Sequence, residues 1–170
     1  LASRAAAAMP RSVHADEEAL PFIAGRLTED EVWVAEVDGA VAGYARFTAT
    51  WLDDLYVHPD HQGEGVGSAL LDLVKAERPD GFCLWVFEVN EPARRFYAGR
   101  GLVELERTDG SANEEHAPDV RMAWPGRDPL RFLRGLIDEV DEQLGDLLAR
   151  RAALTRAVQA HKSDPARDPA

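Results

Sequence analysis

The stretch LYVHPDHQGEGVGSALL, residues 55–71, constrains the fold more than any other part of the chain. It begins as an apolar strand, crosses a polar turn, places three glycines at alternate positions and continues into a helix. The first turn of a helix has N–H groups without intrahelical partners and a partial positive charge, so it can bind a diphosphate. Because glycine lacks a side chain, an anion can approach the backbone closely. The stretch therefore predicts a phosphate-binding junction between a strand and a helix.

Two other nucleotide-binding patterns and a turn without a ligand are the alternatives for this stretch. A P-loop has a Lys immediately before its Ser or Thr, whereas Gly67 precedes Ser68 here, so we set that pattern aside. A Rossmann fingerprint begins at the end of its strand and has a third glycine where Ser68 stands, whereas this strand ends near Val57. The Rossmann site and a glycine-rich structural turn remain open at this point.

The first half of the chain is expected to contain an antiparallel meander. Two runs rich in β-branched and aromatic residues, 31–37 and 40–48, flank Asp38-Gly39, a dipeptide typical of hairpin turns. A third such run, residues 50–57, follows with almost no linker. Two helices are expected before the meander, over residues 2–9 and 15–27.

The second half is expected to alternate helices and strands. The expected elements are a helix at 68–77, a strand at 82–89, a helix at 91–100 and strands at 102–107 and 120–125. A strand–helix–strand crossover that follows a meander indicates an α/β (α+β) fold. We expect a mixed, mostly antiparallel central sheet flanked by helices.

Two linked motifs lie in residues 31–124. They are Q-x-x-G-x-G at residues 62–67 and N-x-x-A-x-x-F-Y at residues 90–97, and Gly101 follows the second. They resemble the pyrophosphate loop and the start of the next helix in the GNAT superfamily of N-acetyltransferases. The resemblance implies an acyl-CoA N-acyltransferase fold over residues 1–126 that transfers an acetyl group to a primary amine in a ternary complex.

The same resemblance implies acetyl-CoA as cofactor and assigns residues to it. The expected cofactor-binding residues are Leu55 and Val57 through main-chain pairing with the pantetheine arm, the N–H groups of Gln62, Gly63, Gly65, Gly67 and Ser68 around the pyrophosphate, and the Asn90 side chain. The sheet of the family splays between its two central strands, and the thioester is expected in that gap. The family also opens with a strand, and no strand pattern is visible before Ala2.

Tyr97 is the expected general acid, because a phenol can donate a proton to a leaving thiolate; a packed aromatic residue is the alternative. The Val57 N–H is expected to polarise the thioester carbonyl. Many members of the family carry a carboxylate near the position of Trp51. Asp53 and Asp54 follow it and are expected to point to opposite faces of the strand, so that at most one faces the cleft. We prefer Asp54 as the general base, with water-mediated deprotonation or an already neutral amine as alternatives.

Other polar residues have competing explanations. Glu114 and Glu115, in the loop before the last strand, would suit a cationic substrate, although a solvated loop explains them as well. His58 and His61 are spaced like a metal pair but lack a third ligand nearby, so no metal is expected. The single cysteine, Cys83, excludes an internal disulfide, and a cytoplasmic location is expected.

The formal net charge of −12 belongs to residues 1–126, because residues 127–170 carry eight basic and eight acidic residues. An acidic body argues against a nucleic acid or an anionic membrane as partner and favours a cationic small molecule or peptide amine, although solubility explains it equally well. No apolar run approaches the ~18 residues that span a bilayer. The first residue is Leu rather than Met, which suggests a fragment.

Residues 127–170 have a different pattern and are expected to form one long helix with a frayed tail. A three-four spacing runs through apolar residues at 130, 133, 137, 140, 144, 147, 154 and 158 and through Arg151. At 1.5 Å per residue such a helix spans roughly 50 Å, longer than a small domain is wide. It therefore requires a packing partner, and a second copy in a homodimer would be one.

This helix resembles the first helix of all-helical chorismate mutases, with the pattern L-R-x-x-I-D-x-x-D-x-x-L-x-x-L-L-x-x-R at residues 133–151. The resemblance places Arg134, Arg151 and Lys162 at the substrate-binding cationic positions of that family. The two further helices of the family are absent from this sequence. A mutase part of a bifunctional fusion, a dimerisation helix, and a non-catalytic acyl-CoA-binding module that carries such a helix are the alternatives.

Overall fold

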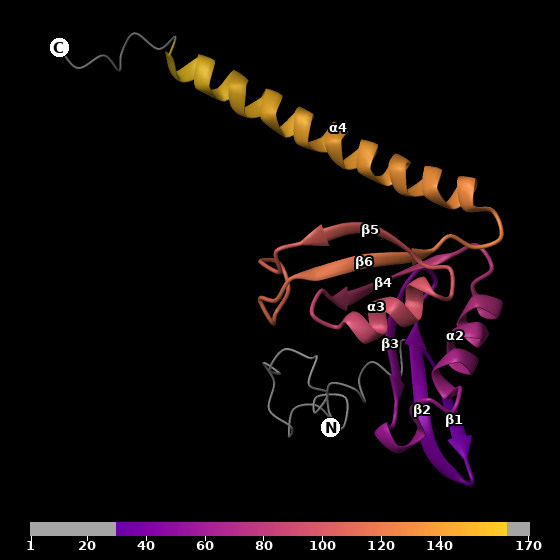
Figure 1. Cartoon of the computed structure of the whole chain (residues 1–170). Helices are drawn as coiled ribbons and strands as arrows, with labels where there is room; N and C mark the ends of the chain where they lie inside the picture. The colour runs from indigo at the N-terminus through magenta and orange to yellow at the C-terminus, as the bar shows by residue number, and fades with distance from the viewer. Residues whose placement is uncertain (1–29, 163–170) are drawn as a thin grey trace. The chain divides into compact units, whose positions relative to one another are not determined.

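The computed structural model describes residues 30–162, whose elements can be followed from indigo to yellow in Figure 1. Three expectations lie outside the described residues. They concern the helices at residues 2–9 and 15–27, an opening strand, and the tail beyond Lys162. The chain divides into two compact units, with the boundary after Pro129. Each unit is described by itself below.

The first sheet is the expected antiparallel meander. Strands β1 (Glu31–Val37), β2 (Ala40–Phe47) and β3 (Leu52–Val57) are hydrogen-bonded in the order β1-β2-β3. The two residues between β1 and β2, Asp38 and Gly39, have φ angles of 52° and 79°. Positive φ at both central residues defines the turn that matches the twist of a hairpin, which explains why this dipeptide stands here.

Helix α2 (Val66–Glu77) follows β3 after a short 3₁₀ turn, η2 (Pro59–His61). Its buried residues, Val66, Leu70, Leu71 and Val74, recur at helical spacing. They join Ala42, Phe47 and Leu52 of the first sheet in one apolar core, so α2 covers one face of that sheet. The helix begins two residues before the predicted start, because Val66 is already part of this buried face.

The second sheet completes the first unit. It contains β4 (Phe82–Phe87), β5 (Val103–Thr108) and β6 (Asp119–Trp124), all antiparallel, in the order β4-β6-β5. Helix α3 (Glu91–Ala98) connects β4 to β5. Phe82, Leu84 and Met122 are almost completely buried, so β4 and β6 supply the core of this half.

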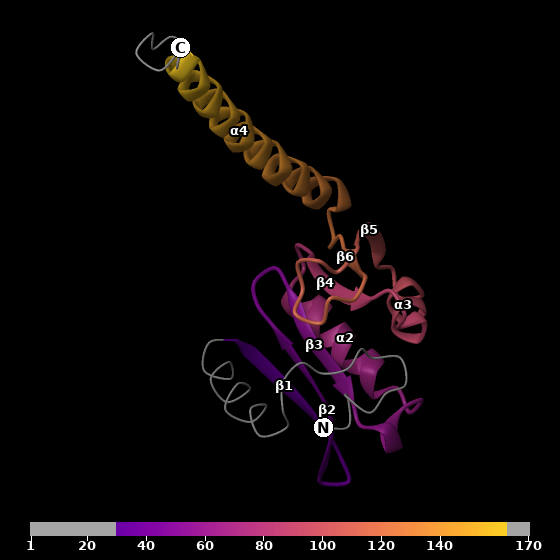
Figure 2. The same cartoon turned by 90° about the vertical axis from the view of Figure 1, so that its left-hand side faces the viewer.

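An isolated β-bridge joins the two sheets. Trp51 and Cys83 pair as a parallel bridge at the beginning of β3 and β4. The two sheets can be followed separately in Figure 2. The expected fold class is confirmed, and the central sheet consists of two antiparallel halves that diverge beyond this bridge.

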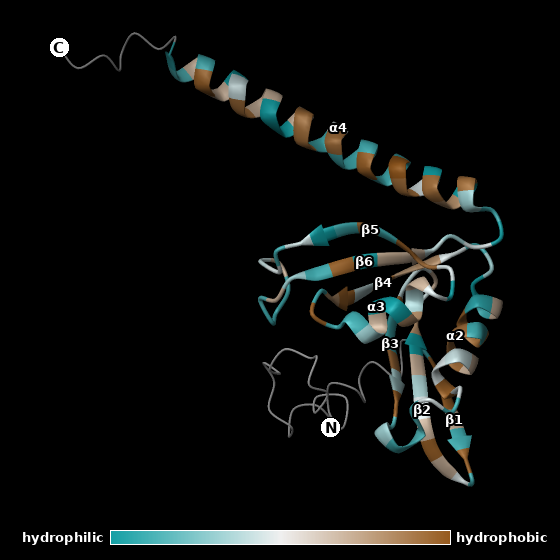
Figure 3. Cartoon of the chain, viewed as in Figure 1, coloured by the Kyte–Doolittle hydropathy of each residue, from teal (hydrophilic) through white to brown (hydrophobic). Residues whose placement is uncertain are grey.

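The described part of the second unit belongs to helix α4 (Pro129–Lys162), a single helix of 34 residues whose first residue, Pro129, is the last of the first unit. It begins at Pro129, as proline at the first helical position predicts. Brown and teal bands alternate along α4 in Figure 3, which is the pattern of an amphipathic helix. None of its residues is buried.

Candidate functional site

Within residues 30–162, the edge of β3 on the side of β4 pairs with no strand beyond the bridge at Trp51, although Val57 O accepts a hydrogen bond from Gln62 Nε2 at 3.3 Å. His58 N donates to Ala42 O at 2.8 Å, and the main-chain groups of successive strand residues point alternately to either side. Tyr56 lies opposite Tyr44 and two residues before His58, so its N–H and C=O groups also point toward β2. The N–H and C=O groups of Leu55 and Val57, which alternate with it, therefore point away from β2. This edge can accept an extended ligand as an additional strand.

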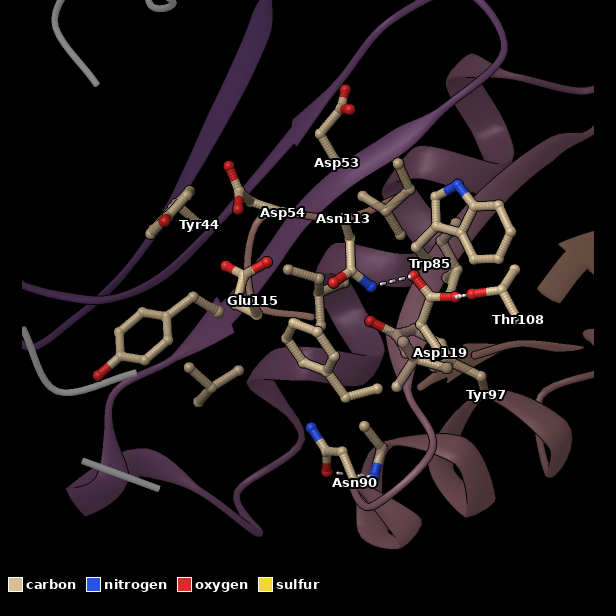
Figure 4. A pocket seen from close by; sticks show the side chains of 18 of the residues that line it. Tyr44, Asp53, Asp54, Trp85, Asn90, Tyr97, Thr108, Asn113, Glu115 and Asp119 are labelled. Carbon is tan, nitrogen blue, oxygen red and sulfur yellow. Dashed lines mark hydrogen bonds between the residues drawn. The ribbon is translucent and has the colours of Figure 1, made fainter. Parts of the chain in front are cut away.

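A cavity of about 920 Å³ lies between β3 and β4 (Figure 4). The whole of β3 and the segment Leu84–Phe87 of β4 line it. The other described lining residues are Tyr44, Pro59, Gln62, Asn90, Ala93, Tyr97, Thr108, Ala112, Asn113, Glu115 and Asp119. Of the residues predicted for the site, Asp54, Leu55, Val57, Gln62, Asn90 and Tyr97 therefore border one cavity.

The glycine loop runs from Gln62 at the cavity to the start of α2. Gly63 and Gly65 have φ angles of 84° and 91°, a region that residues with a side chain rarely adopt. A Cβ on either glycine would meet no atom within 4 Å, so the space beside both is open. Gly65 is the N-cap of α2, and no side chain caps the helix there. The first-turn amides of α2 thus have neither a helical nor a side-chain capping partner, as an anion site requires.

Gly67 and Ser68 lie in the first turn of α2 and do not line the cavity. A Cβ on Gly67 would lie 3.3 Å from Val57 Cγ2 and 3.6 Å from Phe96 Cζ, so this glycine lets α2 pack closely on β3 and α3. Ser68 Oγ accepts a hydrogen bond from Arg100 Nη2 at 2.6 Å. Sequence reasoning missed Arg100, because only the packing of α3 beside α2 brings its charge to the helix start.

Tyr97 enters the site from α3 and is only 9% exposed. Burial raises the pKa of its hydroxyl, and the negative charge of Asp54 raises the pKa further. Tyr97 therefore remains a neutral phenol, able to donate a hydrogen bond or a proton, throughout the physiological pH range. Its ring packs edge-on against that of Phe96, with 5.3 Å between the ring centroids.

Asp53 and Asp54 both line the cavity, as does every other residue of β3. The register between β2 and β3 shifts here: Arg46 pairs with Asp54, and Phe47 pairs with Leu52. Asp53 is the extra residue of a β-bulge, and a bulge re-aims side chains that would otherwise alternate. The sequence pattern could not reveal this irregularity.

Asp54 is held in place by Arg46, a residue that the sequence analysis did not single out. Arg46 Nε donates to Asp54 Oδ2 at 2.6 Å, and Arg46 Nη1 donates to Asp30 Oδ2 at 2.5 Å. Arg46 is 9% exposed, so its charge depends on these carboxylates for compensation. Burial, the largest single influence, lowers the pKa of Arg46, but the hydrogen bonds to Asp54 and Asp30 together outweigh it, so the pKa is raised. Asp54 therefore has a fixed orientation at the cavity wall.

A second carboxylate, Asp119, sits at the cavity end of β6 and is also 9% exposed. It accepts hydrogen bonds from Thr108 Oγ1 at 2.5 Å and from Asn113 Nδ2 at 3.0 Å, drawn as dashed lines in Figure 4. Glu115 lines the cavity from the same loop, whereas Glu114 is not among the lining residues. In the sequence, the only indication of Asp119 is a carboxylate at the start of a strand, which is a weak signal for a site residue. Its partners, Thr108 and Asn113, become evident only in the fold.

The described lining residues include four carboxylates, Asp53, Asp54, Glu115 and Asp119, and no lysine or arginine. Arg46 offsets the charge of Asp54, and the negative charge that the other carboxylates leave on the wall attracts a positively charged group. Figure 4 shows Asp54 and Glu115 on one side of the view and Asn90 at the bottom, beside α3.

Asn90 has a structural role in addition to its place at the cavity. Its Oδ1 accepts a hydrogen bond from Ala93 N at 3.2 Å and thereby caps α3. The cap fixes the start of the helix that carries Tyr97.

His58 and His61 lie beside the loop, and His61 Nδ1 is 2.9 Å from Glu64 Oε2. Within residues 30–162, no group of three or more potential ligands could hold a metal ion.

Comparisons with known proteins agree with this geometry. The family model described as an acetyltransferase (GNAT) domain matches residues 28–103. An uncharacterized N-acetyltransferase of Archaeoglobus fulgidus is 34% identical over 101 residues, which cover 51% of this chain and 68% of the relative. The L-amino acid N-acyltransferase MnaT of Escherichia coli K12 is 38% identical over 80 residues, 41% of this chain and 46% of that protein.

A solved structure shows the same arrangement of elements. The GCN5-related N-acetyltransferase of Rhodopseudomonas palustris superposes with a TM-score of 0.55 at 30% identity, over 65% of this chain and 69% of that one. The chain thus spans two thirds of the archaeal relative and less than half of the Escherichia coli relative. In the described part of the chain, no helix combines the length and the apolarity that crossing a bilayer requires.

Proposed function

Since the chain belongs to the GNAT family of N-acetyltransferases, we propose that it transfers the acetyl group of acetyl-CoA to a primary amine. The proposal rests on three features that lie close together. The open edge of β3, the uncapped glycine start of α2 and the buried phenol of Tyr97 all lie along one cavity wall or directly beside it. The proposed reaction is direct attack by the amine in a ternary complex.

The residues present fit acetyl-CoA. The main chain of Leu55 and Val57 would pair with the pantetheine arm, whose amides require hydrogen-bond partners in an extended geometry. The amides of Gln62, Gly63, Gly65, Gly67 and Ser68 would surround the pyrophosphate, with Arg100 adding a positive charge through its contact with Ser68. The open space beside Gly63 and Gly65 is where a side chain would obstruct the anion. Asn90 would contribute from the cavity wall.

Acetyl-CoA supplies the acetyl group as a thioester when it is bound. The Val57 N–H would donate to the carbonyl oxygen, on which negative charge develops as the amine attacks. Tyr97 would donate its proton to the departing sulfur, because its raised pKa keeps it protonated. The neutral amine loses one proton, which replaces the one that Tyr97 gives to the sulfur, so the transfer from a neutral amine requires no other reactant.

The acceptor is proposed to be a small-molecule or peptide amine that arrives as a cation. The negative charge of the cavity wall, which Arg46 offsets only in part, would attract an ammonium group. Asp54 would take the proton that converts the ammonium into a nucleophilic amine, either directly or through a water molecule. Its contact with Arg46 orients the carboxylate for this role.

The experiment is a calorimetric titration of the protein with acetyl-CoA, followed by a thiol-release assay on a panel of amines that includes cationic and neutral acceptors. The proposal predicts saturable binding and thiol release with at least one cationic amine. Binding without thiol release from any amine would instead support a non-catalytic acyl-CoA-binding module. Absence of binding would refute both.

The mutase-like assignment of α4 stays a prediction. Arg134, Arg151 and Lys162 are exposed on one continuous helix, and the family match ends at residue 103, before that helix begins. Titration with a transition-state analogue of chorismate tests it: binding that Arg151→Ala abolishes would support a mutase fragment, and absence of binding would rule out substrate recognition by this chain alone.

A further inference from the structure

Helix α4 exposes a continuous apolar seam. The seam positions are those of the three-four repeat, from Leu130 to Val158, and Arg151 is the one charged residue among them. Leu130, Ile137, Val140, Leu144, Leu147, Leu154 and Val158 are each at least 50% exposed. Seven exposed large apolar side chains on one helical stripe indicate an interaction surface.

The charges of α4 are divided between its two halves. Residues 129–146 contain two arginines and five carboxylates, a net charge of −3. Residues 147–162 contain three arginines and one lysine and no carboxylate, a net charge of +4 with histidine neutral. The surface that complements this helix must therefore be basic at one end, acidic at the other and apolar along its centre.

We propose that this surface is the α4 helix of a second copy of the chain, packed antiparallel as a two-stranded coiled coil. Reversal of the direction places the acidic half of each helix beside the basic half of the other. The seam positions from Leu133 to Val158 are also symmetric about a point between Gly145 and Asp146. In that register Leu144 faces Leu147 of the partner subunit, Ile137 faces Leu154 of the partner subunit, and Leu133 faces Val158 of the partner subunit.

Arg151 discriminates between the two possible directions. In a parallel pair in register, Arg151 would face Arg151 of the partner subunit, which places like charges together in an apolar seam. In the antiparallel pair Arg151 faces Val140 of the partner subunit, with the carboxylate of the adjoining Asp141 of the partner subunit at the edge of the seam. Only the second arrangement gives this buried cation an opposite charge.

Sedimentation equilibrium of the full chain tests whether the dimer exists. The chain is expected to have twice its formula mass, and Leu147→Glu is expected to halve that mass. Ala149→Glu is the matched control, because it adds the same charge on the opposite face of the helix and should leave the dimer intact. Circular dichroism confirms that both variants remain helical. A wild-type monomer, a larger oligomer, or a Leu147→Glu variant that still dimerises would overturn the proposal.

Disulfide trapping tests the direction. Leu133→Cys and Val158→Cys are prepared separately, with a removable tag on one of them; the native Cys83 is buried and so will not interfere. After mixing and mild oxidation, the antiparallel pair predicts a cross-link between the two variants and none within either alone. Cross-links within each variant alone would show a parallel pair and contradict the proposed arrangement.

Discussion

Trp51 and Cys83 form the parallel bridge at which the two sheets of the first unit meet. Cys83 N donates to Thr50 O at 2.9 Å, and the indole of Trp51 stacks on that of Trp85 with 6.3 Å between centroids. These contacts hold the starts of β3 and β4 together, so the divergence of the strands beyond them leaves the edge of β3 open. The cavity, and with it the proposed cofactor site, is a consequence of this single point of closure.

Replacement of Gly65 by valine is expected to weaken acetyl-CoA binding at least about tenfold, the equivalent of roughly 1.4 kcal/mol. The φ angle of 91° disfavours any side chain, and the added methyl groups would enter the open space beside the loop. Titration calorimetry measures the effect. Gly39→Val is the matched control: Gly39 has φ 79° and the same open surroundings but lies in the hairpin turn between β1 and β2. Equal loss of affinity in both variants would show that strain alone is responsible.

Tyr97→Phe is expected to leave the Kd for acetyl-CoA within about twofold and to lower kcat by at least about tenfold, since general acid catalysis contributes roughly 10²–10⁴-fold. Tyr44→Phe removes the same hydroxyl from another wall of the cavity and is expected to retain kcat. Steady-state thiol release gives both values. Full activity of Tyr97→Phe would remove this residue from the mechanism.

The pH dependence of stability follows from the raised pKa of Tyr97. Below about pH 10 the phenol is protonated in both the folded and the unfolded chain, so no pH-dependent term arises. Above about pH 10 the unfolded chain releases a proton that the folded chain retains, so the free energy of unfolding falls as pH rises. Tyr44, whose pKa burial raises to about 12, acts in the same direction.

Thermal unfolding at about pH 9 and about pH 11 measures this effect. The Tm of the wild type is expected to fall between the two values by more than the Tm of Tyr97→Phe, which lacks the titrating group. All other groups are shared by the two proteins, so the difference isolates Tyr97. An identical decrease in both proteins would mean that the phenol is not buried as described.

Asp54→Asn is expected to lower kcat at least about tenfold near neutral pH, with acetyl-CoA affinity unchanged, if this carboxylate accepts the proton of the acceptor amine. The loss should diminish as pH rises, because a larger fraction of the amine is then already neutral. Asp53→Asn is the control, since Asp53 belongs to the same wall and occupies the bulge. Its Oδ2 lies 3.8 Å from Arg46 Nη1, whereas Asp54 Oδ2 accepts a hydrogen bond from Arg46 Nε at 2.6 Å. A loss that is the same at every pH would indicate an orienting role instead.

Most of the fold could be predicted from local patterns. The hairpin at Asp38-Gly39, the helix after the glycines and the alternation of later elements each follow from signals within a few residues. No local sequence signal predicts the separation into two sheets, because the separation depends on which strand forms hydrogen bonds with β4. That place belongs to β6, which follows β4 in the chain by about 30 residues.

The residues of the candidate site came from two kinds of signal in the sequence. The glycines follow from the local pattern of a strand that leads into a helix, whereas Leu55 and Val57 follow from the resemblance to the GNAT superfamily, and their role in binding a cofactor stays a prediction. Arg46 and Arg100 escaped prediction, because their partners, Asp54 and Ser68, come from neighbouring elements whose register and packing only the fold defines.

We propose that main-chain amides at the junction of β3 and α2 bind the diphosphate of the cofactor. A crystal structure of the protein with coenzyme A is the decisive experiment. It should show the pyrophosphate against the amides of residues 62–68 and the pantetheine arm paired with the open edge of β3. Coenzyme A at another surface, or a cavity that stays closed by side chains at saturating coenzyme A, would refute this mode of binding.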